Sequence, residues 1–269
     1  MRKFYIDNDK FIDQSSRSYL IAEIGHNHQG SLEQCIKMFK VAKECGADAV
    51  KIQKRDNKNL YTKKFYDSKY NSPNSYGQSY GEHRDFLEFG EEEFKELIKA
   101  SKKLKIDFFS TAFDENSLNF LLKIGIKMIK VASADIKNLY LLEKIAESKV
   151  PFIISTGGSD MKDVQDAVNF LLKFHNNFAI LQCTSGYPAE FEELNLNVIE
   201  TYMNKFPDQI IGLSSHDNGI AMPIVAHAIG ARIIEKHFTL NRTFKGTDHA
   251  FSLEPAGLRK LSRDLKRTQ

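Results

Sequence analysis

The chain has 269 residues, of which 42% are hydrophobic, a size and composition that allow one large α/β barrel or two ordinary domains. Its 38 basic and 35 acidic residues are interleaved and leave a net charge of +3, so neither nucleic acid nor a membrane surface is indicated as a partner. Three cysteines without a CxxC spacing argue against a disulfide framework or a structural zinc site. Neither a signal peptide nor a membrane span is recognisable, and we expect a cytoplasmic protein.

The chain repeats one strand-and-helix unit. Residues 1–17 form an N-terminal extension that we expect to fold as a small hairpin at the bottom of the structure. Eight β-rich runs follow, at 19–25, 48–53, 107–113, 128–133, 152–157, 178–184, 210–215 and 232–238. Segments with apolar residues every three or four positions separate these runs, and the last such segment, 255–265, closes the chain. This alternation predicts a closed (β/α)8 TIM barrel, a single domain over residues 1–269.

An open, doubly wound parallel sheet is the alternative architecture for such an alternation. That fold commonly carries a GxGxxG fingerprint directly after its first strand, where glycines let the backbone approach a pyrophosphate. The corresponding stretch here reads GHNHQG, which is not that motif. The closed barrel is therefore the preferred prediction.

One long insertion interrupts the repeat after the second strand. Residues 54–90 are rich in Tyr, Asn, Ser and Lys, and a loop of this length inside a compact domain is usually functional or disordered. Because the insertion leaves the carboxyl end of a barrel strand, we expect it to be a lid or a substrate wall, with a solvated surface loop as the alternative. It carries a polar and aromatic cluster: Tyr76, Tyr80, Glu82, His83 and Arg84.

Two neighbouring runs end in histidine, His216 after IIGLSS and His237 after RIIEK. The carboxyl ends of parallel strands are where α/β folds keep their chemistry. Glu235 points to the same side as His237, because side chains alternate along a strand. Either histidine alone could simply satisfy a core hydrogen bond. Two at equivalent strand ends, with a carboxylate nearby, predict a site for a divalent metal such as Mn²⁺, Zn²⁺ or Fe²⁺.

The other strand ends supply cations, hydroxyls and carboxylates to the same face. They are Glu23, Lys51, Gln53, Thr111, Lys130, Ser133, Asp135, Ser155, Ser185 and Tyr187. A lysine that points into a barrel must meet a carboxylate or bind an anionic ligand, because an unpaired buried ammonium is costly. A structural ion pair with Glu23 or Glu235 is one option for the two lysines. Their number, the hydroxyls and a Gly-Gly turn before a helix favour a phosphate or carboxylate on the substrate.

The strand-end motifs resemble, in order and spacing, the barrel of the N-acetylneuraminate (sialic acid) synthase family. They are IAEIGHNHQGS, GADAVKIQ, FFSTAFD, IKVASAD, IISTGG, ILQCTSGYP, IIGLSSHD and IIEKHFT. The resemblance spans nearly the whole barrel. It implies a metal-dependent condensation of phosphoenolpyruvate with the open-chain aldehyde of a hexosamine, such as N-acetylmannosamine, to a sialic-acid-like nonulosonic acid plus phosphate. It further implies that the metal, usually Mn²⁺, sits on His216 and His237.

The resemblance also assigns roles to the remaining residues. Phosphoenolpyruvate binding is implied for Lys51, Gln53, Thr111, Lys130, Ser133, Ser155 and Ser185. Glu23 and Tyr187 match residues near the reacting centre and the sugar. Glu235 and Asp135 are candidates for proton transfer or for orienting water. From the insertion, Glu82 and His83 are candidates for contacts with the sugar.

Several departures from the family pattern leave the choice of sugar open. Many members have Asn, Glu and Asp at the positions of Ser185, Asp135 and Ser215. Typical members also carry a C-terminal antifreeze-like domain, which is exchanged across a dimer and presents an arginine to the sugar. This sequence ends where the eighth helix is expected, so the insertion, a partner chain carrying that domain, or a different sugar would account for the difference. A homo-oligomer is also an open option.

Two other functions remain alternatives to an active synthase. One is a catalytically incomplete barrel that binds metal and phosphoenolpyruvate but needs the antifreeze-like partner for turnover. The other is a Schiff-base aldolase on the same fold, which would use Lys51 or Lys130 as its nucleophile.

Overall fold

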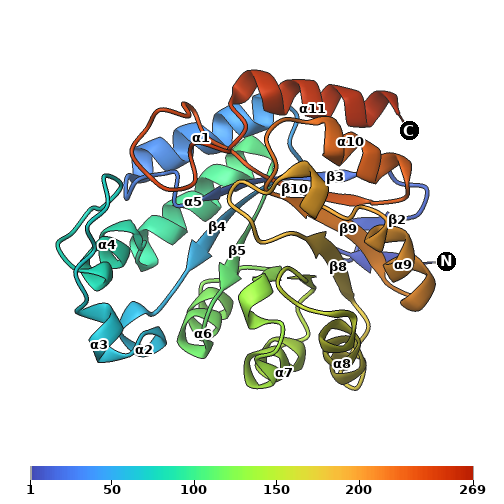
Figure 1. The fold of residues 1–269 in the computed structure, drawn as a ribbon, viewed down its shortest axis with the longest axis horizontal. Coiled ribbons are helices and arrows are strands. Elements are labelled where there is room, and N and C mark those ends of the chain that lie inside the picture. The colour runs from blue at the N-terminus through green and yellow to red at the C-terminus, as the bar shows by residue number, and fades with distance from the viewer. Residues whose placement is uncertain (1, 269) are drawn as a thin grey trace.

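The computed structural model describes residues 2–268 and has a closed parallel barrel at its centre (Figure 1). The barrel strands are β3 (Tyr19–Gly25), β4 (Ala49–Lys54), β5 (Asp107–Ala112), β6 (Ile129–Val131), β7 (Phe152–Ser155), β8 (Phe178–Cys183), β9 (Ile210–Ser215) and β10 (Ile233–His237). Each pairs in parallel with its neighbours in chain order, and β10 pairs with both β9 and β3. The TIM-barrel prediction is therefore confirmed, and the open-sheet alternative is wrong.

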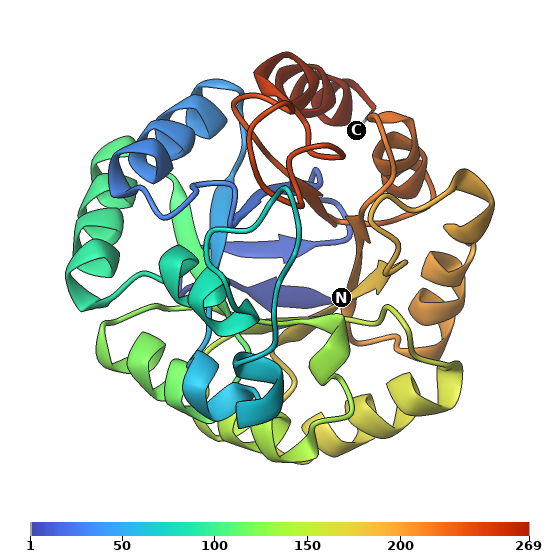
Figure 2. The same ribbon diagram turned by 60° about the vertical axis from the view of Figure 1, so that its left-hand side comes forward.

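Eight helices alternate with these strands and form the outer ring seen in Figure 2. They are α1 (Leu32–Glu44), α5 (Glu91–Leu104), α6 (Glu115–Lys123), α7 (Leu139–Glu147), α8 (Met161–Leu171), α9 (Val198–Lys205), α10 (Ala221–Ala228) and α11 (Pro255–Arg267). Two 3-10 turns, Ser133–Asp135 and Phe191–Glu193, follow β6 and β8. In α5 the apolar period buries Phe94 and Leu97 and leaves Glu96 exposed. No helix within residues 2–268 has the length and apolar character needed to cross a bilayer.

The N-terminal extension forms an antiparallel hairpin of β1 (Lys3–Tyr5) and β2 (Phe11–Asp13). Phe4 is buried in the core, and Arg232 Nε, just before β10, donates to the backbone carbonyl of Gln14 over 2.8 Å. Lys10 pairs with Asp107, the first residue of β5. These contacts lie at the amino ends of the barrel strands, so the predicted hairpin at the bottom of the barrel is confirmed.

The insertion at 54–90 contains three short helices, α2 (Asn57–Leu60), α3 (Lys63–Tyr66) and α4 (Tyr80–Leu87). In Figure 2 its teal ribbon crosses in front of the strands at the centre of the ring of helices. It is attached to the loop after β10, because Tyr76 Oη donates to the Lys245 carbonyl over 2.5 Å and the Gly246 N–H donates to Asn74 Oδ1 over 3.1 Å. The insertion is therefore a structured segment at the carboxyl-terminal end of the barrel, and its role as a lid or substrate wall stays a prediction.

Candidate active site

A cavity of about 530 Å³ opens at the carboxyl-terminal end of the barrel. Each of the eight strands contributes at least one lining side chain, because inward-facing residues alternate along every strand. In strand order from β3 to β10, these are Glu23, Lys51, Thr111, Lys130, Ser155, Cys183, Ser214 and Glu235. The volume lies in the range of sites that hold small molecules.

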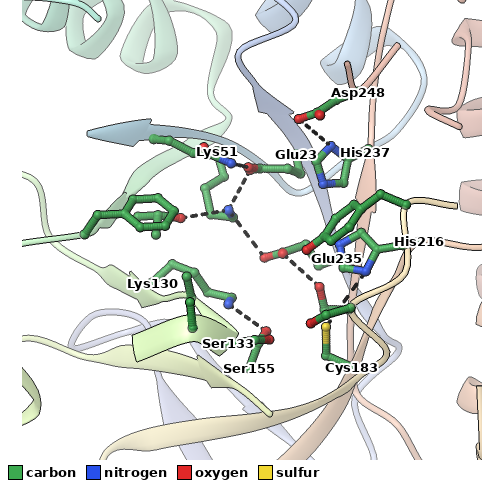
Figure 3. A pocket seen from close by; sticks show the side chains of 18 of the residues that line it. Glu23, Lys51, Lys130, Ser133, Ser155, Cys183, His216, Glu235, His237 and Asp248 are labelled. Atoms are coloured by element: carbon green, nitrogen blue, oxygen red, sulfur yellow. Dashed lines mark hydrogen bonds and ion pairs between the residues drawn. The ribbon is translucent and has the colours of Figure 1, made fainter. Parts of the chain in front are cut away.

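Most of the residues predicted from the sequence meet in this cavity. They are Glu23, Lys51, Gln53, Thr111, Lys130, Ser133, Ser155, Ser185, Tyr187, His216, Glu235 and His237. Asp135, Glu82 and His83 are not among its lining residues. The inner part, which we call the floor cluster, consists of Glu23, Lys51, Lys130 and Glu235 and is shown in Figure 3.

Lys51 is the centre of the floor cluster and is buried. Its Nζ lies 2.6 Å from Glu23 Oε2 and 3.8 Å from Glu235 Oε2, and it donates to Thr111 Oγ1 over 3.0 Å. Gln53 Nε2 holds the other oxygen of Glu23 over 2.8 Å. The structural ion pair that the sequence left open is therefore present for Lys51.

Lys130 has a different environment although it is equally buried. Its Nζ donates to Ser155 Oγ over 2.7 Å and to the Val131 carbonyl over 2.8 Å, and within residues 2–268 it forms no ion pair. Burial lowers the pKa of Lys130, Glu235 opposes this shift, and the positive charge of Lys51 adds to it. A buried ammonium that is held by one hydroxyl and one carbonyl, without an ion pair, is suited to bind an anion.

The hydroxyls beside Lys130 come from three different loops and strand ends. Ser133 Oγ accepts the Gly157 N–H over 2.9 Å, which joins the loops after β6 and β7. A Cβ on residue 157 would collide with Ser185 Oγ, so the Gly-Gly turn lets the Ser185 hydroxyl come close to this backbone. Ser133, Ser155 and Ser185 therefore surround one wall of the cavity.

The pKa values of the two carboxyl groups of the floor cluster are shifted in opposite directions. Burial raises the pKa of Glu23, and Lys51 only partly opposes this rise. Burial would also raise the pKa of Glu235, but Lys51 and Lys130 outweigh it and lower the value to about 2. Neighbouring carboxyl groups whose pKa values diverge are typical of paired acid and base roles. Of the two, Glu23 has the pKa shifted upward and is the better candidate for proton exchange, whereas Glu235 is held as an anion.

His216 and His237 lie side by side at the ends of the neighbouring strands β9 and β10, with ring centroids 5.3 Å apart. His216 Nδ1 lies 2.9 Å from the Thr184 carbonyl, which places its proton on Nδ1 and leaves the lone pair on Nε2. Burial lowers the pKa of His237 to about 3, and its buried Nδ1 has no hydrogen-bond partner within the described chain. Both imidazoles therefore offer nitrogen ligands to a metal.

The metal site predicted from the sequence has two protein ligands in this arrangement. Residues 2–268 contain no group of three or more His, Cys, Asp or Glu side chains placed to hold an ion. The nearest carboxylate to His237 is Asp248, with Oδ2 3.8 Å from Nδ1 (Figure 3). The two histidines fit a divalent cation whose other ligands are oxygen atoms of water or substrate.

Tyr187 forms the outer edge of this part of the cavity. Its ring centroid lies 4.3 Å from that of His216, and 57% of the residue is exposed. An aromatic ring with a hydroxyl at the entrance suits a sugar, which presents both an apolar face and hydroxyl groups.

Three predicted site residues lie elsewhere. Asp135 belongs to the turn after β6, where burial raises its pKa to about 6 and its buried Oδ2 lacks a hydrogen-bond partner. Glu82 is exposed, and its carboxylate caps α4 by accepting the N–H groups of Gln78 (2.7 Å) and Ser79 (3.2 Å). His83 is buried beside the Tyr70 ring. Successive helix residues are about 100° apart, so only Arg84 of this run points into the cavity.

Among the lining residues that carry a charge or an imidazole, sequence reasoning assigned no role in the site to His26, Arg55, Arg84 or Asp248. Arg55 had a usable signal, because Lys51, Gln53 and Arg55 are two residues apart and alternation predicts one shared face. His26 and Asp248 lie in loops after β3 and β10, where no periodicity applies. Their placement depends on contacts with the insertion.

Comparison with known proteins gives consistent matches. The NeuB family model matches residues 38–269. Human N-acetylneuraminate-9-phosphate synthase is 40% identical over 248 residues, which cover 92% of this chain and 69% of the human protein. N,N'-diacetyllegionaminic acid synthase of Legionella pneumophila is 36% identical over 260 residues, 94% of this chain and 72% of that protein. The crystal structure of a sialic acid synthetase from Leptospira borgpetersenii superposes with a TM-score of 0.88 at 34% identity, covering 99% of this chain and 90% of that one.

Proposed function

The chain belongs to the NeuB family, and on this premise we propose that it condenses phosphoenolpyruvate with the open-chain aldehyde of an N-acetylated hexosamine, releasing phosphate and forming a nonulosonic acid. Relatives named for N-acetylneuraminate 9-phosphate and for diacetyllegionaminic acid synthesis support this reaction class. They differ in the sugar and in its phosphorylation. The observation that carries the proposal is that the two lysines and two glutamates of the floor cluster converge with His216, His237 and several hydroxyl groups in one cavity.

Phosphoenolpyruvate would bind on the side of the cavity that carries Lys130. This ammonium has hydroxyl partners but no carboxylate, so an anionic ligand would supply the missing counter-charge. Ser133, Ser155 and Ser185 would donate to phosphate or carboxylate oxygens, with Lys51 and the hydroxyl of Thr111 on the opposite side. Such fixed donors hold the enol carbon C3 toward the histidines.

In the reaction, C3 of the enol forms a bond to the aldehyde carbon, and water adds at the cationic C2 before the carbon–oxygen bond to phosphate breaks. The water loses two protons in all: one balances the proton gained by the aldehyde oxygen, and the other leaves the C2 hydroxyl with the phosphate as the keto group forms. Glu23, with its raised pKa, is the residue we assign to this proton exchange. Glu235 stays ionised beside Lys51, where it stabilises the cationic C2 and orients the water.

We assign the binding of a divalent metal, Mn²⁺ by preference, to His216 and His237. When bound there, such an ion supplies Lewis-acid polarisation of the aldehyde oxygen. The Thr184 carbonyl fixes the His216 ring for this task, and Tyr187 closes the entrance beside it. A cytoplasmic location and a homo-oligomer or partner chain remain predictions from the sequence.

The test is to incubate the purified chain with Mn²⁺, phosphoenolpyruvate and a panel of N-acetylhexosamines, and to measure phosphate release and the keto-acid product. We expect sugar-dependent release that is abolished by a chelator. Binding of metal and phosphoenolpyruvate without turnover would instead support the incomplete-barrel alternative. Trapping of pyruvate on the protein by borohydride would indicate a Schiff-base aldolase.

A further inference from the structure

A second group of cations lies at the outer part of the same cavity. We call it the mouth cluster: His26 after β3, Arg55 after β4, and Arg84 on α4 of the insertion. Arg55 Nη1 lies 3.2 Å from His26 Nε2, and Arg84 Nη1 lies 3.2 Å from His26 Nδ1. The two guanidinium groups thus hold one imidazole between them.

One imidazole cannot satisfy both arginines. A neutral imidazole has a single acceptor nitrogen, and a protonated one has none, so at most one guanidinium can donate to this ring. Burial, together with the two arginines, lowers the pKa of His26 and keeps the ring neutral. At least one arginine therefore has N–H groups directed at His26 that lack an acceptor.

Carboxylates balance the mouth cluster only in part. Glu88 forms its ion pairs and is shared by Lys54 at 3.2 Å, His26 at 3.7 Å and Arg55 at 4.0 Å. Asp248 lines the same cavity and interacts electrostatically with His26 and Arg84, but it forms an ion pair with neither of them. Arg84 forms no ion pair with any described residue. Arg84 is therefore a cation in the cavity wall without a paired counter-ion, and an anionic ligand would supply one.

Both arginines are held in place before any ligand binds. The Arg55 guanidinium stacks on Phe113, 3.6 Å from the ring centroid, and 8% of the residue is exposed. Arg84 donates from Nε and Nη2 to Tyr80 Oη over 2.9 and 2.8 Å. Planar guanidinium groups fixed in this way are suited to bidentate recognition of a phosphate.

We infer that the mouth cluster binds a phosphate ester on the acceptor, so that the natural sugar substrate is a phosphorylated N-acetylhexosamine. This inference rests on the proposed function. The floor cluster and the hydroxyls around Lys130 already provide cationic and donor groups for the two anionic groups of phosphoenolpyruvate. The mouth cluster lies outside them, on the loops and the insertion, where the end of the sugar remote from the aldehyde would reach.

The test compares N-acetylmannosamine with its 6-phosphate, two acceptors that differ only in the ester, at saturating phosphoenolpyruvate and Mn²⁺. We expect wild-type kcat/KM to be higher for the 6-phosphate. Arg84→Gln and, independently, Arg55→Gln should lower the ratio of the two kcat/KM values about 10- to 100-fold, the range of a lost charge-assisted contact. Arg84→Lys keeps the positive charge, so its ratio of the two kcat/KM values should stay closer to wild type than that of Arg84→Gln. Lys64→Gln removes an exposed cation of the same insertion and should leave the ratio unchanged.

The outcomes separate this inference from the proposed function. A wild-type preference for the unphosphorylated sugar, or an Arg84→Gln ratio equal to wild type, overturns the inference while synthase activity stands. If the arginine variants instead raise the KM of phosphoenolpyruvate, the inference is also overturned, because the arginines would then bind that substrate. If no sugar turns over, calorimetry with the 6-phosphate decides. Binding that Arg84→Gln removes supports the phosphate site although the proposed function fails, and absence of binding overturns it.

Discussion

The floor cluster and the mouth cluster each bring two cationic side chains into one cavity, but their charges are balanced differently. In the floor cluster, strand residues pair Lys51 with two carboxylates on neighbouring strands. In the mouth cluster, loop and insertion residues direct two arginines at one imidazole, with one shared carboxylate. Internal pairing keeps the reacting groups fixed, whereas unbalanced charge at the entrance favours an anionic ligand. We therefore assign the chemical steps to the floor cluster and the selection of the sugar substrate to the mouth cluster.

The largest effect should come from the histidines beside the floor cluster. Replacing His216 or His237 with Ala removes one of two nitrogen ligands, so Mn²⁺-dependent phosphate release should fall more than about 1,000-fold. A calorimetric titration with Mn²⁺ should show weakened binding, while an unchanged circular dichroism spectrum serves as the control for folding. Full activity of the double variant in the presence of chelator would show that these residues hold no catalytic metal.

Lys51→Met would break the internal balance of the floor cluster. It leaves Glu23 and Glu235 buried without their shared cation, so the free energy of unfolding should fall by about 3 kcal/mol in a urea titration. The matched change at the mouth, Arg84→Met, leaves no carboxylate unpaired and should cost less than about 1 kcal/mol. Equal losses for the two variants would contradict the proposed difference between the clusters.

Lys130→Met tests the one floor lysine that lacks an ion pair. The change keeps the stem and removes the charge, so phosphoenolpyruvate binding should weaken by about 2–3 kcal/mol in calorimetry. The unfolding free energy should not fall as it does for Lys51→Met, because no carboxylate is left alone. Unchanged affinity would refute the assignment of Lys130 to phosphoenolpyruvate.

Asp135→Asn should have the smallest effect, and that effect concerns stability. Burial raises the pKa of Asp135 from 3.8 to about 6 in the folded state, so the protonated form is favoured there. The stabilisation is complete below the unfolded-state value and is lost as pH rises through about 6. At pH 7 the variant should therefore be more stable than wild type by about 1–2 kcal/mol, after allowance for solvent screening, with no gain at pH 3. A difference that does not change with pH would exclude this cause.

The sequence predicted the barrel fold and the residues of the floor cluster. Strand residues alternate with a period of two, and a closed parallel barrel brings all eight carboxyl ends to one face. Residues such as Glu23, Lys51 and His237 therefore had to line one cavity once the strands were recognised. The same reasoning could not decide that Lys51 is paired and Lys130 is not, because that depends on distances between neighbouring strands.

The arrangement of the mouth cluster could be determined only from the tertiary structure. The insertion is anchored by Tyr76 to the Lys245 carbonyl, residues 169 positions apart, and no local pattern encodes such a contact. Which residue of the Glu82–Arg84 run points inward depends on where α4 begins, at its Ser79 cap. The local sequence thus determined the strands because their period is fixed by backbone geometry, whereas the loops took their positions from long-range packing that one sequence does not reveal.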